Sequence, residues 1–117
     1  MPTEPITIET NDAEESAPSP RFDLPVPDTD DVVAVAALMA EPVRAGILAI
    51  LRDGPHCVCE MAAALDVKQN NLSNHLARLR EAGLVRASRH KVDARWVYYE
   101  RDEEAISTAS EALSQVL

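Results

Sequence analysis

The 117-residue chain lacks the features of secreted, membrane-spanning and disulfide-built proteins. Its two cysteines are too few for a disulfide scaffold. The longest apolar run, VVAVAALMA at 32–40, is far shorter than the roughly 20 residues that span a bilayer. The N-terminal MPTEPITIET has no basic start and no apolar segment, so it does not resemble a signal peptide. We therefore expect a cytoplasmic protein with reduced thiols and no membrane partner.

Catalytic signatures are also missing. No Gly-rich phosphate loop and no nucleophile beside a base can be placed in the chain. A thiol oxidoreductase is the rival interpretation from another functional class, but it would need a CxxC pair in a βαβ frame, and the chain has neither. Apolar residues make up 46% and aromatic residues only 3%, so the core should be aliphatic. We expect no enzyme activity and no organic cofactor.

Acidic residues dominate the total charge but not every part of the chain. The net charge is −9, yet residues 68–101 hold eight Lys/Arg and three Asp/Glu, a local net of +5. DNA responds to the field of the face that it meets, so this segment permits a nucleic-acid partner. Residues 1–29 hold six of the eight prolines, and seven Asp/Glu against one Arg. We predict a disordered acidic arm over 1–29 and a folded domain over 30–117.

Hydrophobic periodicity after the arm predicts helices, then a hairpin and a last helix. Five helices are expected, over about 30–40, 42–52, 57–65, 69–82 and 102–116. Pro42 suits a first helical turn, and Gly83 suits the residue after a helix. The pattern changes to period two in LVRAS (84–88) and RWVYYE (95–100), which predicts a hairpin with a basic link. The fold class is therefore mainly α with a β-hairpin, a winged helix-turn-helix.

The first and last helices have apolar faces that a domain of this size cannot bury alone. In the first helix the predicted face is Val32, Val35, Ala36 and Met39. In the last helix it is Ala105, Ile106, Ala109, Ala112, Leu113 and Val116. We expect these faces to form a two-fold interface, so that the protein is a homodimer that reads a palindromic site.

The fourth helix is the predicted DNA-reading element. Leu72, Leu76 and Leu79 are spaced as one buried stripe, which leaves small polar groups on the opposite face. Amides pair well with adenine, and arginine with guanine or phosphate. The residues expected to contact double-stranded operator DNA from this helix are Gln69, Asn70, Asn71, Ser73, Asn74, His75 and Arg78. His75 lies nearer the buried edge, where packing and phosphate contact are both open.

Basic side chains gather in and beside the hairpin tip, where they would hold the phosphates that flank the groove being read. The residues predicted for this role are Arg86, Arg89, His90, Lys91 and Arg95. The aromatic residues Trp96, Tyr98 and Tyr99 are predicted to pack within the hairpin rather than to stack on bases.

Four segments, in order over 33–101, resemble the ArsR/SmtB family of metal-responsive transcriptional repressors. ALMAEPVRAGILAILRDG resembles the family's ALADPTRLRILxLL, and HCVCEMAAAL resembles its ELCVCDLxxAL. NNLSNHLARLREAGLV resembles its xxVSxHLxxLRxAGLV, and RWVYYE resembles its wing strand. The resemblance implies a dimeric winged-helix repressor that releases its operator when an inducer binds. Similarity to the CVC subset implies arsenite or antimonite as the inducer, with cadmium, lead or zinc as alternatives.

Two positions depart from the family pattern. Arsenic sensors of the best-known type have a third cysteine five residues after the first, where this chain has Ala62. The zinc-sensing branch binds zinc in the C-terminal helix through histidines and acidic ligands, but no histidine follows His90. The first departure leaves the ligand set open, and the second argues against that zinc site.

Cys57 and Cys59, in HCVCEM (56–61), are the candidate ligands. Residues two apart on a regular helix point about 200° away from each other, so both sulfurs reach one ion only if the turn distorts or the pair lies at the helix start. Thiolates prefer soft ions and gain from a helix N-terminus. Chelation would pull the pair together, distort the third helix and disturb the recognition helix that it supports.

The remaining ligands and the chemistry of the pair have alternatives. A third ligand could come from His56, a solvent oxygen, a small-molecule thiol or the acidic arm of either protomer. Two other interpretations of the pair stay open, a redox switch in the same repressor and two buried structural thiols.

Overall fold

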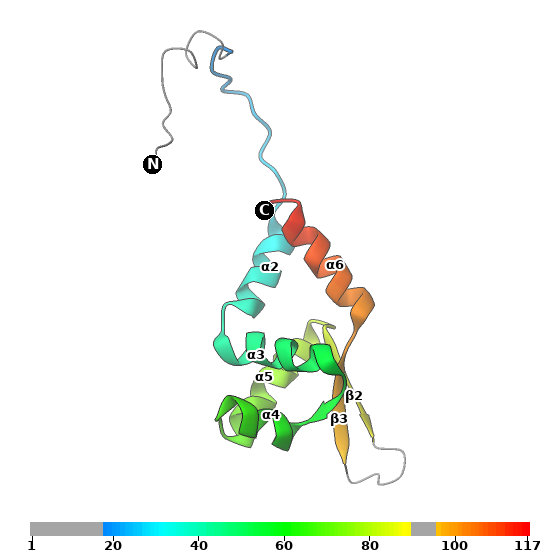
Figure 1. The fold of residues 1–117 in the computed structure, drawn as a ribbon. Helices are drawn as coiled ribbons and strands as arrows, with labels where there is room; N and C mark the ends of the chain where they lie inside the picture. Colours follow the sequence, from blue (N-terminus) through cyan, green and yellow to red (C-terminus); the bar gives the residue numbers. More distant parts are fainter. Residues whose placement is uncertain (1–17, 90–95) are drawn as a thin grey trace, which may run out of the picture.

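The structure, a computed structural model, describes residues 18–89 and 96–117 (Figure 1). Residues 18–29 contain no helix or strand, and the predicted boundary at residue 30 stays a prediction. The elements are α2 (Asp30–Met39), α3 (Pro42–Ile50), the 3₁₀ turn η2 (Leu51–Asp53), β1 (His56–Cys57), α4 (Val58–Leu65), α5 (Gln69–Glu81), β2 (Val85–Arg89), β3 (Val97–Arg101) and α6 (Glu103–Ser114). This order confirms the predicted winged helix-turn-helix.

Particular residues set the helix ends close to the predicted places. Glu41 caps α3, because its Oε2 accepts a hydrogen bond from the Val43 backbone N–H at 2.6 Å. Pro42 occupies the first turn of that helix, where its missing N–H costs nothing. At the other end of the motif, α5 stops just before Gly83, whose φ of 81° lies in the left-handed region that favours glycine.

A three-stranded antiparallel sheet, in the order β1-β3-β2, joins the hairpin to the start of α4. β2 and β3 pair along their whole length. In β1, His56 pairs with Tyr99 and Cys57 pairs with Tyr98. Two residues are too few to show a period-two pattern, which is why the sequence does not predict β1. The short strand nevertheless connects the cysteine segment directly to the hairpin.

The core lies where α3, α4 and α5 meet the start of β2. The predicted stripe of α5 is confirmed, since Leu72, Leu76 and Leu79 are at most 1% exposed. The side chains that pack with this stripe are Ile47, Leu48, Leu51, Met61, Ala62, Leu84 and Val85. No polar or charged side chain is buried in the described residues, so aliphatic burial, worth about 25 cal/mol per Å², holds α5 against its neighbours.

α2 and α6 contact each other beside this core, and neither has a fully buried residue (Figure 1). The predicted face of α6 is partly buried as expected, except that Val116 lies beyond the helix and is exposed. In the predicted face of α2, Val32 and Val35 are half-buried, and Ala36 and Met39 are exposed in the single chain. Leu38, which is not part of the predicted face, is also half-buried and packs against the core. The two-fold contact of this face stays a prediction.

Within the described residues, no single helix has the length and apolar composition to cross a bilayer. In the same described part of the chain, α2 and Pro42–Asp53 together reach that length and composition, but this pair bends by 88° at its junction.

Candidate functional site

Cys57 and Cys59 meet where β1 ends and α4 begins. Cys57 is the N-cap of α4, with an extended backbone (φ −88°, ψ 168°), and Cys59 lies in the first turn of the helix. The two sulfur atoms are 2.7 Å apart, and both cysteines are free thiols. Of the two geometries expected for a CxC pair, the molecule has the helix-start geometry. The sulfurs therefore converge without any distortion of a helical turn.

A capping box surrounds the backbone and the sulfur of Cys57. The Cys57 N–H donates to Glu60 Oε1 at 2.9 Å, and the Glu60 N–H faces the Cys57 sulfur. The same carboxylate oxygen lies 3.4 Å from His56 Nδ1. Hydrogen bonds from Cys57, backbone first, lower the pKa of Glu60, so its carboxylate is ionised at neutral pH. Glu60 thus holds the first turn of α4 to the end of β1.

The Cys57 thiol is less acidic than its place at a helix start would predict. Its side chain is buried, with 6% exposed, whereas Cys59 is half-buried. Burial is the largest cause that raises the pKa of Cys57, and the hydrogen bond with Cys59 raises it further. The opposing effect of the Glu60 N–H is smaller than both. The expected stabilisation of a thiolate by the helix N-terminus is therefore outweighed, and Cys57 is a protonated thiol at neutral pH.

A third ligand is not assembled beside the two sulfurs. Across residues 18–89 and 96–117, no group of three or more His, Cys, Asp and Glu side chains is close enough to hold a metal ion. His56, the predicted protein candidate, faces Glu60. Most of the acidic arm, residues 1–17, lies outside the described part. The described chain thus offers two converging sulfurs to a thiophilic ion, and the source of a third ligand stays a prediction.

The outward face of α5 has the polar surface that the sequence predicts. The side chains exposed there are Gln69, Asn70, Asn71, Ser73, Asn74 and Arg78. Asn70 Oδ1 accepts from the Asn71 backbone N–H at 2.8 Å, which satisfies one of the free donors at the helix start. Among the described residues, Arg78 has no carboxylate within salt-bridge distance. DNA contact by this face stays a prediction, and its exposure meets the first requirement for such contact.

His75 differs from its neighbours on α5. Its side chain is 19% exposed, and its Nδ1 lies 3.1 Å from Nη1 of Arg44 on α3. Its Nε2 lies 3.8 Å from Glu41 Oε2. Of the two roles that the sequence leaves open, this geometry favours packing against α3, while phosphate contact stays a prediction.

Arg86 lies at the end of the hairpin opposite the link, which corrects the prediction that it lies beside the tip. It is paired across the strands with Glu100, and the Arg86 Nε–Glu100 Oε2 distance is 2.9 Å. Its Nη1 is 3.5 Å from Asp102 Oδ2. The hydrogen bond with Glu100, followed by the charges of both carboxylates, raises the pKa of Arg86. A phosphate would have to compete with two carboxylates for this guanidinium. The strand register places Arg86 beside Glu100 and Asp102, and sequence periodicity does not reveal that register.

The remaining hairpin residues that are predicted to contact phosphate lie outside the described part of the structure. They are Arg89, of which only the backbone is described, and His90, Lys91 and Arg95. Their contacts with phosphate stay predictions.

Two cations outside the predicted set of DNA contacts also face solvent near this surface. Lys68 is the N-cap of α5, and Arg80 is in its last turn. Neither has a carboxylate within salt-bridge distance in the part of the chain that the structure describes. Arg80 lines a groove of about 400 Å³ with Ala87, Ser88, Val97 and Tyr99. The local net charge of +5 is the sequence signal that includes both cations. Trp96, predicted to pack, is 48% exposed beside the same hairpin.

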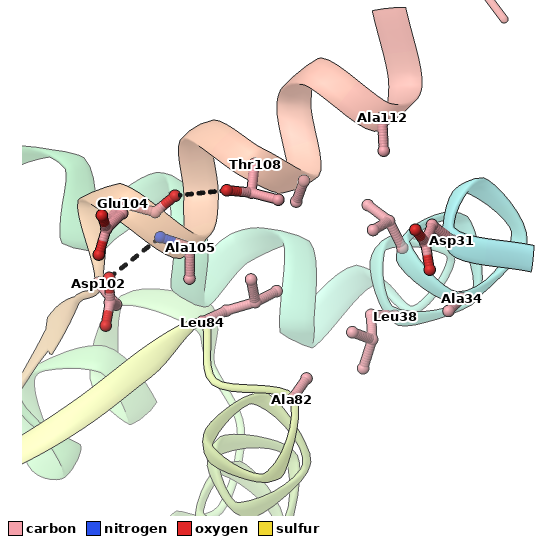
Figure 2. Close-up of a pocket in the computed structure, with 12 residues that line it drawn as sticks. Asp31, Ala34, Leu38, Ala82, Leu84, Asp102, Glu104, Ala105, Thr108 and Ala112 are labelled. Atoms are coloured by element: carbon pink, nitrogen blue, oxygen red, sulfur yellow. Dashed lines mark hydrogen bonds between the residues drawn. The ribbon is translucent and has the colours of Figure 1, made fainter. Parts of the chain in front are cut away.

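A groove of about 690 Å³ lies between α2 and α6 (Figure 2). Its walls are mostly small and aliphatic, with Leu38 from α2 and Ala105 and Ala112 from α6. Acidic groups stand along it, including Asp31 and Asp102, and Asp102 caps α6 by accepting from the Ala105 N–H at 3.0 Å (Figure 2). This apolar surface lies on the two helices that are predicted to form a two-fold contact.

Comparison with known proteins agrees with this geometry. Residues 41–87 match the description "Bacterial regulatory protein, arsR family". The chain is 45% identical over 62 residues to the arsenic resistance transcriptional regulator ArsR1 of Pseudomonas putida, a match that covers 52% of this chain and 46% of that relative, about half its length. It is 34% identical over 83 residues to the biofilm growth-associated repressor of Agrobacterium fabrum, covering 71% of this chain and 68% of that protein. A crystal structure of a possible transcriptional regulator for arsenical resistance has a TM-score of 0.62 at 28% identity, over 69% of this chain and 81% of that one. The chain therefore belongs to the arsR family of bacterial regulatory proteins.

Proposed function

We propose that the protein is a homodimeric transcriptional repressor that releases its operator when arsenite or antimonite binds Cys57 and Cys59. The observation that carries this proposal is the convergence of the two sulfurs, 2.7 Å apart, at the start of the helix that packs against α5. Relatives named as an arsenic resistance regulator and as a repressor support it. Chemistry at the sulfurs can therefore reach the predicted DNA-reading helix through one packed interface.

In this proposal α5 enters the major groove and the hairpin holds flanking phosphates. The exposed amides at the start of α5 supply base contacts. Lys68, Arg78 and Arg80 supply cations that have no carboxylate within salt-bridge distance among residues 18–89 and 96–117. The groove between α2 and α6 is covered by a second copy, which places two α5 helices on one palindromic site. The cytoplasm, where thiols stay reduced, suits such a sensor.

The protonated state of Cys57 favours arsenous acid over a divalent cation as inducer. Arsenous acid, As(OH)₃, reacts with two thiols to give two As–S bonds and two water molecules, so each thiol proton leaves as part of water. Cadmium, lead or zinc must instead expel the protons into solution before the thiolates can bind. Because burial raises the pKa of Cys57, this expulsion costs more free energy at neutral pH than it would for an exposed thiol.

Ion binding would fix the two sulfurs at the spacing and angle that the ion requires. Two thiolates bound at about 2.3 Å with a tetrahedral angle are roughly 3.7 Å apart. Moving Cys57 withdraws its sulfur from the Glu60 N–H and shifts β1, which pairs with β3. Both DNA-reading elements are then disturbed, α5 through α4 and the hairpin through β3. Release follows if the ion binds the DNA-incompetent state more tightly.

The test uses an operator selected by the wild-type protein from a random DNA pool, with a fluorescent label and an excess of reductant. Cys57→Ser and Cys59→Ser should keep operator binding and lose release by arsenite, because a hydroxyl is a poor ligand for soft ions. Val58→Ala is the matched control, since it alters the same turn without touching a sulfur. His56→Gln asks whether His56 is the third ligand. Normal arsenite release from both serine variants would rule out the site.

The same sulfur contact supports a second candidate function, a repressor released by oxidation. Two adjacent thiols and one peroxide molecule give a disulfide and two water molecules, with the sulfurs oxidised and the peroxide reduced. The raised pKa of Cys57 slows this reaction, because the thiolate is the nucleophile. Peroxide release with a loss of two hydrogen atoms per chain by mass spectrometry, reversed by reductant, would favour oxidation over ion binding.

A further inference from the structure

Arg44 contacts two other helices through three different nitrogens. Its Nε donates to the Leu38 carbonyl oxygen at 2.8 Å, and its Nη2 donates to the Ala37 carbonyl oxygen at 3.3 Å. Both carbonyls belong to the last turn of α2, and the Ala37 oxygen also accepts from the backbone N–H of Ala40, the C-cap, at 3.4 Å. The third nitrogen, Nη1, lies 3.1 Å from His75 Nδ1 on α5. One guanidinium in the first turn of α3 therefore joins the end of α2 to the middle of α5.

The chemistry of this contact fixes the histidine ring. Arginine has donors only, so His75 Nδ1 must accept and the ring hydrogen must be on Nε2. That Nε2 faces Glu41 Oε2 at 3.8 Å, and the same oxygen accepts from the Arg44 backbone N–H at 3.1 Å. Glu41, Arg44 and His75 thus form one half-buried polar cluster at the junction of α2, α3 and α5. The cluster is directional, unlike the aliphatic packing along the other edge of α5.

We infer that Arg44 and His75 are positioning residues that set the angle of the recognition helix α5 relative to α2. The inference rests on the proposed function, in which α2 belongs to the two-fold interface. The orientation of α5 relative to α2 then fixes the distance and angle between the two α5 helices of a dimer. Half-sites of a palindrome are about 34–36 Å apart along one helical turn of DNA. After a small rotation of α5, the dimer could therefore fit one α5 helix into its half-site while the other α5 helix is misplaced relative to the second half-site.

The geometry of the guanidinium, rather than its charge, performs this role. A lysine ammonium at position 44 would keep the charge but could not reach two carbonyls and a ring nitrogen with a rigid planar fork. Position 75 allows a parallel comparison. Asparagine can offer an acceptor near the place of Nδ1, whereas glutamine places its amide nearer the place of Nε2. His75→Asn should therefore recover the contact that His75→Gln loses.

The experiment compares the selected operator with the same operator carrying one extra base pair between its half-sites, and with random DNA. The variants are Arg44→Lys, His75→Gln and His75→Asn, with Arg52→Lys, an exposed arginine on η2, as the control. We expect Arg44→Lys and His75→Gln to lower the preference for correct spacing by about tenfold while affinity for random DNA changes little. His75→Asn should restore most of the preference, and circular dichroism melts identify any variant that fails to fold.

Two results would overturn the inference while leaving the proposed function intact. An unchanged spacing preference in folded Arg44→Lys and His75→Gln would show that the cluster does not orient α5. Equal losses on operator and random DNA in His75→Gln, with a smaller salt dependence, would make His75 a phosphate contact instead. Failure of the wild-type protein to prefer any DNA sequence would sink the proposed function, and the inference with it.

Discussion

The pH dependence of inducer affinity distinguishes neutral arsenous acid from divalent cations at Cys57 and Cys59. The perturbation is a change from about pH 6.5 to about pH 8.5, which stays below the raised pKa of Cys57. Cys57 is 6% exposed and protonated over this range, so a divalent cation must displace its proton. Arsenous acid is also neutral in this range, and its reaction with thiols yields water without releasing protons. The two classes of inducer should therefore respond differently.

The magnitude follows from proton linkage. Each proton displaced below its pKa makes the apparent affinity rise about tenfold per pH unit. Displacement of the Cys57 proton alone predicts that cadmium affinity rises about 100-fold over the two units, and that the rise stops once pH exceeds the pKa of Cys57. Cadmium affinity rises with pH because a thiol with a raised pKa stays protonated, and the cation must displace that proton. Arsenite affinity should change by less than about threefold over the same interval.

The assay is release of fluorescent operator followed by anisotropy, with titrations of arsenite and of cadmium at each pH and a monothiol as reductant. Operator affinity without inducer is measured at each pH as the control, since protonation of DNA-contacting residues would shift both titrations together. An arsenite midpoint that moves about tenfold per pH unit, in parallel with cadmium, would refute the proton balance. A cadmium midpoint independent of pH would refute the protonated state of Cys57.

Three further outcomes test the fold and the arm. Leu76→Ala should lower the free energy of unfolding by about 2–5 kcal/mol, because Leu76 is 1% exposed in the core stripe of α5. Arg78→Ala on the exposed face should change it by less than about 0.5 kcal/mol. Urea denaturation measures both, and equal losses would contradict the assigned faces. Gly83→Ala should lower the free energy of unfolding by about 1 kcal/mol, because φ at this position is 81° and no atom lies close to a new Cβ, so the loss comes from the backbone alone. Gly83→Asn should lower it less. An unchanged melting temperature in the alanine variant would argue against a left-handed residue there. If the acidic arm competes with DNA for the basic hairpin, deletion of residues 1–29 should tighten binding to random DNA more than binding to operator at low salt. Equal affinities of the full chain and the deletion variant for random DNA at low salt would leave only a solubilising role for the arm.

The helices could be predicted from the sequence because their signals are local. The stripe of Leu72, Leu76 and Leu79 repeats at helical spacing, and Pro42 and Gly83 mark ends whose chemistry depends on one residue each. β1 could not be predicted in this way, because a two-residue strand exists only through its pairing with β3. The burial of Leu38 has a similar origin. Helical period defines a stripe, but contacts with the rest of the fold decide which side of an evenly apolar segment is buried.

The cysteine pair illustrates how far local pattern determines a site. The spacing of Cys57 and Cys59 leaves two geometries, and a start of α4 after DGPH favours the one that occurs. The acidity of the thiol is not local, because burial by surrounding elements opposes the helix N-terminus and prevails. Long-range partners also decide the role of arginines. Arg86 is paired with carboxylates through the strand register, and Arg44 joins α2 to α5 through contacts between residues that are far apart in the sequence.

In the proposed function, the position of Cys57 at a strand–helix junction would let binding of one ion affect both α4 and the hairpin. Loss of a helix N-cap typically costs about 0.5–2 kcal/mol. Coupling between an inducer and a second ligand typically amounts to about 1–3 kcal/mol, or roughly 5- to 150-fold in affinity. Withdrawal of the Cys57 sulfur from the Glu60 N–H would weaken this cap, and because sulfur is a weaker acceptor than oxygen, we expect a contribution at the lower end of that range. A pair in the middle of α4 would have no cap to lose and no strand to move, so its chelation would have to break the helix itself.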